Sequence, residues 1–331
     1  MRFFRPWRLL ILGLALLAVV AFLWAYPSGE YIFLPDVAHP VAPLVTVPHA
    51  DPPARGAVYY VDVIVRKASL LERIFHGLHA GADVFPASDV NPPGVNDATR
   101  RKLDLLDMRH SQSIAAAVAL RALGRKVGIV DTGALVEDVI PGEPAAGKIF
   151  PDDVITAIDG APVRTRRQVF DTMTRHTIGD SVRVTVRRQS KTLVIPLHTV
   201  ASTGGPRRPV VGIIISQAVD IHLPIPIRID AGGVGGPSAG VAFALEVMEQ
   251  LGRNVVRGHK IAATGELSVD GSVSAIGGVK QKVYGARAAH VDAFLVPAGD
   301  NAREARKYAG GLRIIPVESF QQALQALAKL P

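Results

Sequence analysis

A glycine-rich loop that runs straight into an apolar helical pattern, GGVGGPSAGVAFALEVMEQLG at residues 232–252, is the most constraining feature of this sequence. Ser238 stands where the helix should begin. Serine is a favoured N-cap residue, so a helix cap is the simplest interpretation. The spacing G-x-S-x-G also matches a nucleophile elbow, and Asp270 and His290 follow in the order of a serine hydrolase. However, the preceding strand pattern ends near Asp230, and the intervening loop argues against an elbow.

Composition limits the classes of protein that the chain can belong to. Its 331 residues are 48% hydrophobic and 20% charged, which predicts two or three domains with buried cores. The net charge of +8 is spread over scattered lysines and arginines without interleaved aromatic residues, so we expect a solvated basic surface and no nucleic-acid partner. The absence of cysteine excludes disulfides, thiolate metal sites and a cysteine nucleophile.

The amino terminus predicts a membrane anchor. MRFFRPWR carries three arginines, and residues 9–26 contain no charge, close to the ~20 residues that a spanning helix needs. The positive-inside rule would keep residues 1–8 cytoplasmic and place the rest of the chain outside the cell membrane. A cleaved signal peptide is the alternative. Bulky residues at 22–26, where small ones should flank a cleavage site, favour an uncleaved single-pass anchor over residues 1–26.

The segments that follow predict an α+β fold. Residues 27–55 are rich in proline and are interpreted as an extended tether. Residues 56–68 alternate like a strand, residues 85–96 are a polar loop, and residues 107–124 carry a strong helical pattern that ends at a glycine. We therefore expect residues 56–124 to form one segment and a different module to begin at residue 125.

Residues 125–203 resemble a PDZ domain. The similar pieces are VIPGEPA at 139–145, DDVI at 152–155 and IDG at 158–160. PDZ domains bind extended carboxyl-terminal peptides as an added strand, and the resemblance implies that role here. The carboxylate-binding loop matches poorly, because RKVGIVDTG occupies its place. The resemblance thus predicts the fold and leaves peptide binding open.

A P-loop spacing inside this module is not interpreted as a nucleotide site. Residues 142–148 read GEPAAGK, but Ile149 stands where a Ser or Thr is needed to bind magnesium. The following FPDD sequence does not begin the helix whose amino terminus should hold a phosphate. We expect no ATP site and no cofactor.

Two segments of residues 204–331 resemble the signature motifs of the Lon-type Ser-Lys peptidases. These are GGPSAG around Ser238 and IGGVKQKVYGARAAH, which begins at Ile276 and places Lys280 42 residues after the serine. Between them, ATGELSVDGSVSAIGG resembles the hairpin of that family. The resemblance implies that Ser238 is the nucleophile and Lys280 the base, that Thr264 is their hydroxyl partner, and that Gly236 and Pro237 are supporting residues. Lys282 is expected to point elsewhere and to be solvated.

The chemistry of such a dyad sets requirements on its surroundings. A lysine with an ordinary pKa of about 10.4 is protonated at neutral pH, and burial must lower that value before the amine can accept a proton. The backbone amide of Ser238, at a helix amino terminus, is a candidate oxyanion donor. No metal is implied, and the ten histidines show no ligand spacing.

Residues 56–68 and 107–124 resemble the early part of a Lon-type catalytic domain, which predicts that the PDZ-like module is inserted within it. These features together predict an ATP-independent, membrane-anchored serine endopeptidase that cleaves unfolded or extended exported polypeptides, including ones with accessible carboxyl termini. The alternative is a catalytically inactive or self-processing membrane-tethered PDZ scaffold. The family resemblance implies a homo-oligomer, with a hexamer as the family's usual state.

Overall fold

The structure of the 331-residue chain is a computed structural model that describes residues 6–50, 55–75, 77–91, 96–202 and 207–331. The basic start at residues 1–5 lies outside the described residues. So do residues 51–54 of the expected tether and residues 92–95 of the expected polar loop.

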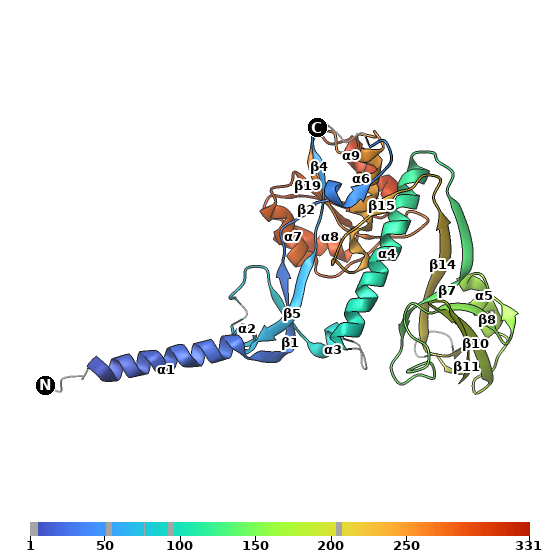
Figure 1. Cartoon of the computed structure of the whole chain (residues 1–331), viewed down its shortest axis with the longest axis horizontal. Helices are drawn as coiled ribbons and strands as arrows, with labels where there is room; N and C mark the ends of the chain where they lie inside the picture. The colour runs from blue at the N-terminus through green and yellow to red at the C-terminus, as the bar shows by residue number, and fades with distance from the viewer. Residues whose placement is uncertain (1–5, 51–54, 76, 92–95, 203–206) are drawn as a thin grey trace.

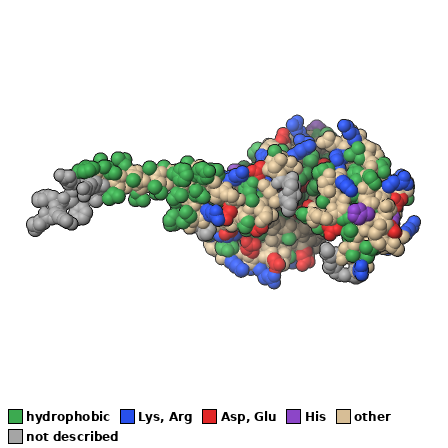
Figure 2. All heavy atoms as spheres, turned by 90° about the horizontal axis from the view of Figure 1, so that it is seen from below, with side chains coloured by type: hydrophobic (Ala, Val, Ile, Leu, Met, Phe, Trp, Pro, Cys, Tyr) green, Lys and Arg blue, Asp and Glu red, His purple; other side chains and the backbone are tan. Residues whose placement is uncertain are grey.

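The first helix, α1 (Pro6–Ala25), projects from the body of the molecule (Figure 1). Exposed apolar side chains line it between Leu10 and Trp24 (Figure 2). A bilayer core about 30 Å thick requires about 20 consecutive apolar residues in a spanning helix. Over the part of the chain that the structure describes, no helix has the length and apolarity to cross a membrane. The prediction of a transmembrane anchor is therefore wrong, and the single-pass localisation derived from it is wrong as well.

The proline-rich segment that follows is folded and is not an extended tether. β1 (Pro27–Pro35) is the central strand of an antiparallel sheet, with β5 (Val63–Ser69) on one side and β6 (Asp83–Pro86) on the other. Its Tyr31 and Ile32 are buried. Farther on, the chain forms β2 (His39–Pro40), the 3₁₀ helix η1 (Ala42–Leu44) and β3 (Val45–Thr46). The apolar residues between the prolines therefore pack into the body of the protein.

A five-stranded sheet in the order β2-β4-β16-β19-β20 forms the centre of the body. Its parallel strands are β4 (Ala57–Tyr60), β16 (Lys260–Ala263), β19 (Ala293–Pro297) and β20 (Arg313–Val317). Strand residues alternate between two apolar cores, as the two-residue period of a strand requires. Ile261 belongs to the core shared with the helix that follows Ser238, whereas Ala262 belongs to the core on the opposite face.

Helices cover both faces of this sheet (Figure 1). The first core includes residues of α4 (Asp97–Ala122), α6 (Gly240–Gln250) and α9 (Phe320–Ala328). The second core includes residues of α7 (Val279–Ala288) and α8 (Asp300–Tyr308). The expected helix at 107–124 is the second half of α4, which Asn96 caps by accepting a hydrogen bond from the Thr99 amide.

The short elements complete the fold around these layers. They are α2 (Leu70–Ile74), α3 (Ala87–Val90), β12 (Val200–Ala201), β13 (Pro209–Val210), β15 (Arg228–Ile229), η2 (Pro237–Ala239), β17 (Glu266–Leu267) and β18 (Val273–Ser274). β15 pairs with β3, and β17 with β18. The pair β17–β18 is the hairpin that the sequence predicts between the two peptidase motifs.

The PDZ-like module is a separate sheet with its own core. Its strands lie in the order β11-β10-β8-β7-β14, with β9 beside β8. Their bounds, together with those of the module's helix, are β7 (Gly128–Val139), β8 (Val154–Ile158), β9 (Ala161–Pro162), α5 (Arg166–Met173), β10 (Ser181–Arg188), β11 (Lys191–His198) and β14 (Ile213–His222). In the chain, this module stands between β4 and β16, which are hydrogen-bonded neighbours in the central sheet. The overall class is mixed α+β, as predicted.

Candidate active site

Ser238 lies in η2, the single 3₁₀ turn that leads into α6. Two contacts from α4 hold the chain on either side of it. The Gly236 amide donates to the Asp104 carbonyl at 2.7 Å, and the buried Ser111 Oγ donates to the Pro237 carbonyl at 2.9 Å. Gly236 has φ 84°, a left-handed conformation that glycine adopts without strain. The two predicted supporting residues therefore shape the turn that presents Ser238.

The carbonyl group of Ser238 is bound by the chain that follows β16. The Gly265 amide donates to it at 2.8 Å and Thr264 Oγ1 at 3.1 Å. Thr264 is fully buried. The chain that follows β16 thus holds the serine turn by its carbonyl group, and it places Thr264 beside Ser238.

The amine next to the serine hydroxyl belongs to Lys282. Its Nζ donates to Ser238 Oγ at 2.9 Å and to Thr264 Oγ1 at 3.4 Å. The Lys282 side chain is only 4% exposed. Burial lowers its pKa from 10.5 to about 7, and the negative charge of Asp62 acts in the opposite direction. A large fraction of this amine is therefore neutral at neutral pH, as a general base requires.

Lys280 does not lie beside Ser238, so the predicted Ser238–Lys280 pairing is wrong. Its Nζ donates to Asp83 Oδ1 at 2.8 Å and to the Ala82 carbonyl at 3.1 Å. Residues two positions apart on a helix differ by about 200° of rotation around its axis. Lys280 and Lys282 therefore emerge on opposite sides of α7. Both lysines follow the same Gly-Gly pair in the sequence. The orientation of α7 toward Ser238 determines which of the two contacts the serine. The expectation that Lys282 is solvated is wrong for the same reason.

The serine–aspartate–histidine alternative is not assembled. Asp270 accepts hydrogen bonds from the amide and hydroxyl of Ser272, within the turn between β17 and β18. His290 lies in the turn that follows α7, where its amide donates to the Arg287 carbonyl. The hydroxyl of Ser238 instead accepts a hydrogen bond from the Lys282 amine.

Several carboxyl groups near the serine turn have raised pKa values. Burial, opposed by the charge of His110 and assisted by neighbouring carboxylates, raises the pKa of Asp107 on α4 to about 6. Burial also raises the pKa of Glu266, which begins β17, and Glu137 of the PDZ-like module adds to this shift. Asp230 instead caps the glycine loop, accepting the Gly232 amide at 3.0 Å. None of these acids bonds to the Ser238–Lys282 pair among the described contacts.

Asp62 and Ser111 are the residues near the site that sequence reasoning missed. The sequence held one signal for Asp62: an acid that directly follows the apolar strand residues AVYYV is a candidate for a partly buried charge. Ser111 gave no such signal. It stands among the polar residues of a long helix, and its hydrogen bond to Pro237 joins positions 126 residues apart.

A serine hydroxyl bonded to a buried lysine, at the start of a helix packed on a mixed sheet, defines the site as one of the Ser-Lys peptidase type. Residues 212–329 match the family model of the Lon protease (S16) C-terminal proteolytic domain, and residues 118–199 match that of the PDZ domain. The predicted resemblances are confirmed: the chain carries a Lon-type serine peptidase domain and a PDZ domain.

Curated relatives share this proteolytic segment. The chain is 42% identical over 88 residues to Lon protease 1 of Sorangium cellulosum, covering 26% of this chain and 10% of the relative. It is 32% identical over 114 residues to Lon protease 2 of Bacillus subtilis, covering 34% of this chain and 19% of the relative. The matches thus span a tenth to a fifth of these relatives' length. Among solved structures, the PDZ domain of the SdrC-like protein of Listeria monocytogenes is 25% identical, with a TM-score of 0.24, over 25% of this chain and 87% of that one.

Proposed function

We propose that this protein is a serine endopeptidase in which Ser238 is the nucleophile and Lys282 the general base. The observation that carries the proposal is the 2.9 Å contact between Lys282 Nζ and Ser238 Oγ in a buried site. A serine hydroxyl needs a base to take its proton before it can attack a carbonyl. Lys282 is suited to this task because burial brings its pKa to about 7.

The proposed reaction has two steps. Neutral Lys282 accepts the hydroxyl proton while Oγ bonds to the substrate carbonyl carbon. The peptide C–N bond then breaks, and the ammonium of Lys282 returns the proton to the leaving amine. In the second step, Lys282 takes a proton from a water molecule that attacks the ester. The ammonium of Lys282 then gives this proton to Ser238 Oγ as the ester C–O bond breaks, so Ser238 leaves as an alcohol and Lys282 is neutral again. Thr264 Oγ1, 3.4 Å from Nζ, directs the amine toward the serine.

The backbone near Ser238 is proposed to stabilise the oxyanion. The Ser238 amide stands at the amino-terminal end of the η2–α6 helical segment, where peptide dipoles favour developing negative charge. The Gly236 amide has a separate role, because it is bonded to the Asp104 carbonyl. The rigid anchoring of this turn by α4 keeps the hydroxyl and the amide in fixed relation.

We propose that the substrates are unfolded or extended polypeptides, cleaved without ATP. Residues 142–148, which have the P-loop spacing, form turns before β8 and do not lead into a helix. The PDZ domain offers an apolar pocket of about 90 Å³ lined by α5, β8 and the start of β14, with Val169, Phe170 and Ile213 among its residues. A pocket of this kind supports capture of an apolar carboxyl-terminal side chain. A homohexamer, the family's usual state, belongs to this proposal and is measurable by light scattering.

The direct test compares the full chain with its Ser238→Ala variant on an unstructured protein substrate such as casein. Wild type is expected to cleave the substrate at the same rate with and without ATP and magnesium, and Ser238→Ala is expected to be inactive. Cleavage confined to the chain's own residues would support the self-processing alternative. Tight peptide binding without any cleavage would support the scaffold and contradict the proposal.

Activity is also expected to depend on pH through Lys282. The neutral amine is the active form, so kcat/KM should fall about tenfold per pH unit below the pKa of about 7 and level off above it. The measurement is kcat/KM between pH 5 and 9 on a short peptide without titratable side chains. A profile that is flat from pH 5 to 9 would show that no group with this pKa acts as the base.

A further inference from the structure

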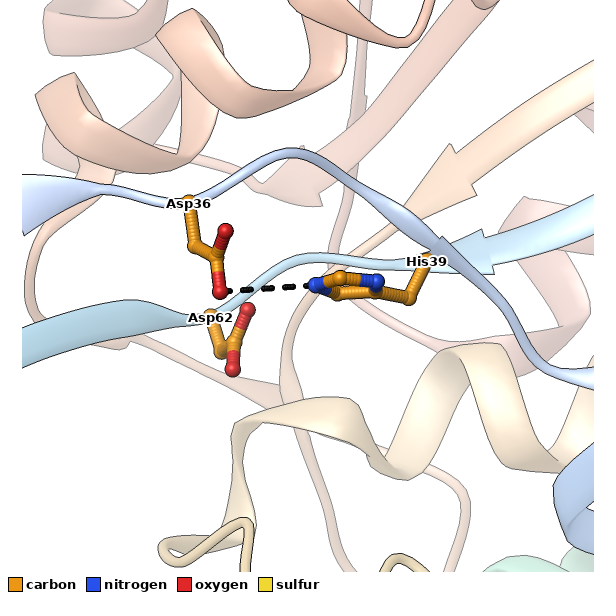
Figure 3. A group of neighbouring side chains, drawn as sticks. All are labelled: Asp36, His39 and Asp62. Atoms are coloured by element: carbon orange, nitrogen blue, oxygen red, sulfur yellow. Dashed lines mark hydrogen bonds and ion pairs between the residues drawn. The ribbon is translucent and has the colours of Figure 1, made fainter.

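A cluster of potential metal ligands lies beside the proposed catalytic centre. Asp36 follows β1, His39 begins β2, and Asp62 lies between β4 and β5, with the three side chains directed toward one another (Figure 3). One ligand atom from each side chain lies within 4.8 Å of those of the other two. His39 Nε2 and Asp36 Oδ2 are 3.4 Å apart. Two carboxylates and an imidazole, from the segment at 36–39 and from the chain after β4, thus form one cluster.

Asp62 brings a second, independent observation. Its Oδ1 is buried and has no hydrogen-bond partner among the described residues. A buried polar atom without a partner is unfavourable, so native structures rarely keep one unless another group satisfies it. The Asp62 Oδ1 atom is therefore available to a ligand that the described side chains do not supply.

We propose that Asp36, His39 and Asp62 bind a divalent transition-metal ion of the Mn²⁺ or Zn²⁺ class. Imidazole nitrogen together with carboxylate oxygen suits these ions, whereas Mg²⁺ and Ca²⁺ prefer oxygen ligands alone. Ligand atoms about 2.0–2.2 Å from a common ion lie about 3–4 Å from one another, so small side-chain rotations close the present spacing. The side chains of His39 and Asp36 are 43% and 33% exposed, which leaves an entry path and room for water ligands.

A protonated His39 does not account for this cluster equally well. Its one contact with a carboxylate is 3.4 Å long and involves Asp36, so it leaves Asp62 Oδ1 without a partner. A metal ion in the centre would bind all three side chains at once. No metal was expected from the sequence, because the family resemblance implies none and the histidines show no ligand spacing. Asp62 is distant from Asp36 and His39 in the chain and comes near them through the β2–β4 pairing.

The site is connected to Lys282 through Asp62. Tyr60 pairs with Ala263, the residue before Thr264, so the chain reaches Asp62 at the end of β16 where Thr264 contacts the lysine. The Asp62 carboxylate is the charge that favours the ammonium form of Lys282. A cation bound to Asp62 cancels this field and favours the neutral amine. This consequence rests on the proposed function, whereas metal binding itself does not.

The binding test uses the full chain carrying Ser238→Ala, so that metal affinity is measured without peptidase activity. After dialysis against a chelator, MnCl₂ and, separately, ZnCl₂ are titrated by calorimetry, and bound Mn²⁺ is followed by electron paramagnetic resonance. We expect one ion per chain. Because loss of outer partners of a metal ligand already costs about 10–100-fold, Asp62→Asn and His39→Gln should each weaken affinity at least about tenfold.

The matched control is His259→Gln. His259 and Asp292 are another histidine–aspartate pair, 3.7 Å apart. Among the described residues, no third potential metal ligand lies with them. Its affinity for metal should equal that of the parent, and thermal melts should show that all variants fold. Absence of saturable binding, or equal affinity in the parent and in the cluster variants, would overturn the site.

In wild type, Mn²⁺ is expected to raise cleavage several-fold at pH 6. Binding without this increase would overturn only the coupling to Lys282.

Discussion

A Lys282→Met variant is expected to lose about 10³-fold or more in kcat/KM, whereas Lys280→Met should stay within a few-fold of wild type. General base catalysis commonly contributes 10²–10⁴-fold, and methionine keeps the shape of lysine without an amine that can accept a proton. The Lys282 amine lies 2.9 Å from Ser238 Oγ, whereas the Lys280 amine is held by Asp83. Steady-state cleavage of a short fluorogenic peptide by the two purified variants is the measurement.

Lys280→Met is a matched control, because it makes the same substitution two residues earlier on the same helix. Its partly exposed pair with Asp83 contributes little to stability, about 1 kcal/mol or less, so the variant should fold. Comparable losses in both variants, with circular dichroism showing that both are folded, would contradict the assignment of Lys282. Loss in Lys280→Met alone would restore the pairing expected from the sequence.

The two lysines show where sequence reasoning about the site ends. The motifs around Ser238 and Gly278 predicted the serine turn, the hairpin and the helix that carries the base. They could not predict which side of that helix faces the serine, because VKQK offers a lysine on each side. That orientation depends on contacts with distant residues, including Asp83 of β6, which binds Lys280, and Val63, which packs against Gly278.

The fold shows a similar division between local and long-range information. The helix α6 was predicted from local periodicity, whereas the single strand predicted at 56–68 is two strands, β4 and β5, which belong to different sheets. The segment at 27–55 was interpreted as a tether because its prolines suggested an extended, unpaired chain. Its strands become recognisable only through their partners, β5 and β6 for β1 and β15 for β3. Likewise, β14 lies beyond the expected end of the PDZ domain but pairs with β7.

The electrostatics of the site could not be predicted from the sequence either. Asp62 and Lys282 are separated by most of the chain. In the fold they are close enough that the charge of each shifts the pKa of the other. The sequence predicted that the base must be buried, which the 4% exposure of Lys282 satisfies. The parallel pairing of β4 with β16 adds Asp62, whose charge opposes the effect of burial. Position in the fold thus determines the pKa on which the proposed chemistry depends.

A Lys282→Met variant is expected to be more stable than wild type at pH 7, and this advantage should shrink as the pH rises toward 10. The pKa of Lys282 is about 7 in the folded protein and 10.5 as its ordinary value, so between these pH values the unfolded chain binds the extra proton. The free energy of unfolding of wild type therefore rises with pH across this window. At one pKa unit per 1.36 kcal/mol, the shift corresponds to a destabilisation on the order of 4 kcal/mol at pH 7.

The measurement is the difference in Tm between Lys282→Met and wild type at pH 7, 8, 9 and 10, because titrations common to both proteins cancel in a difference. At pH 7, the variant should melt about 5 °C or more above wild type, and the gap should close steadily toward pH 10. Lys280→Met serves again as the control, since Lys280 lies outside the buried pocket, and its Tm difference should stay constant. A gap for Lys282→Met that does not change with pH would mean that Lys282 is not destabilised by burial, and it would remove the physical basis for its role as the base.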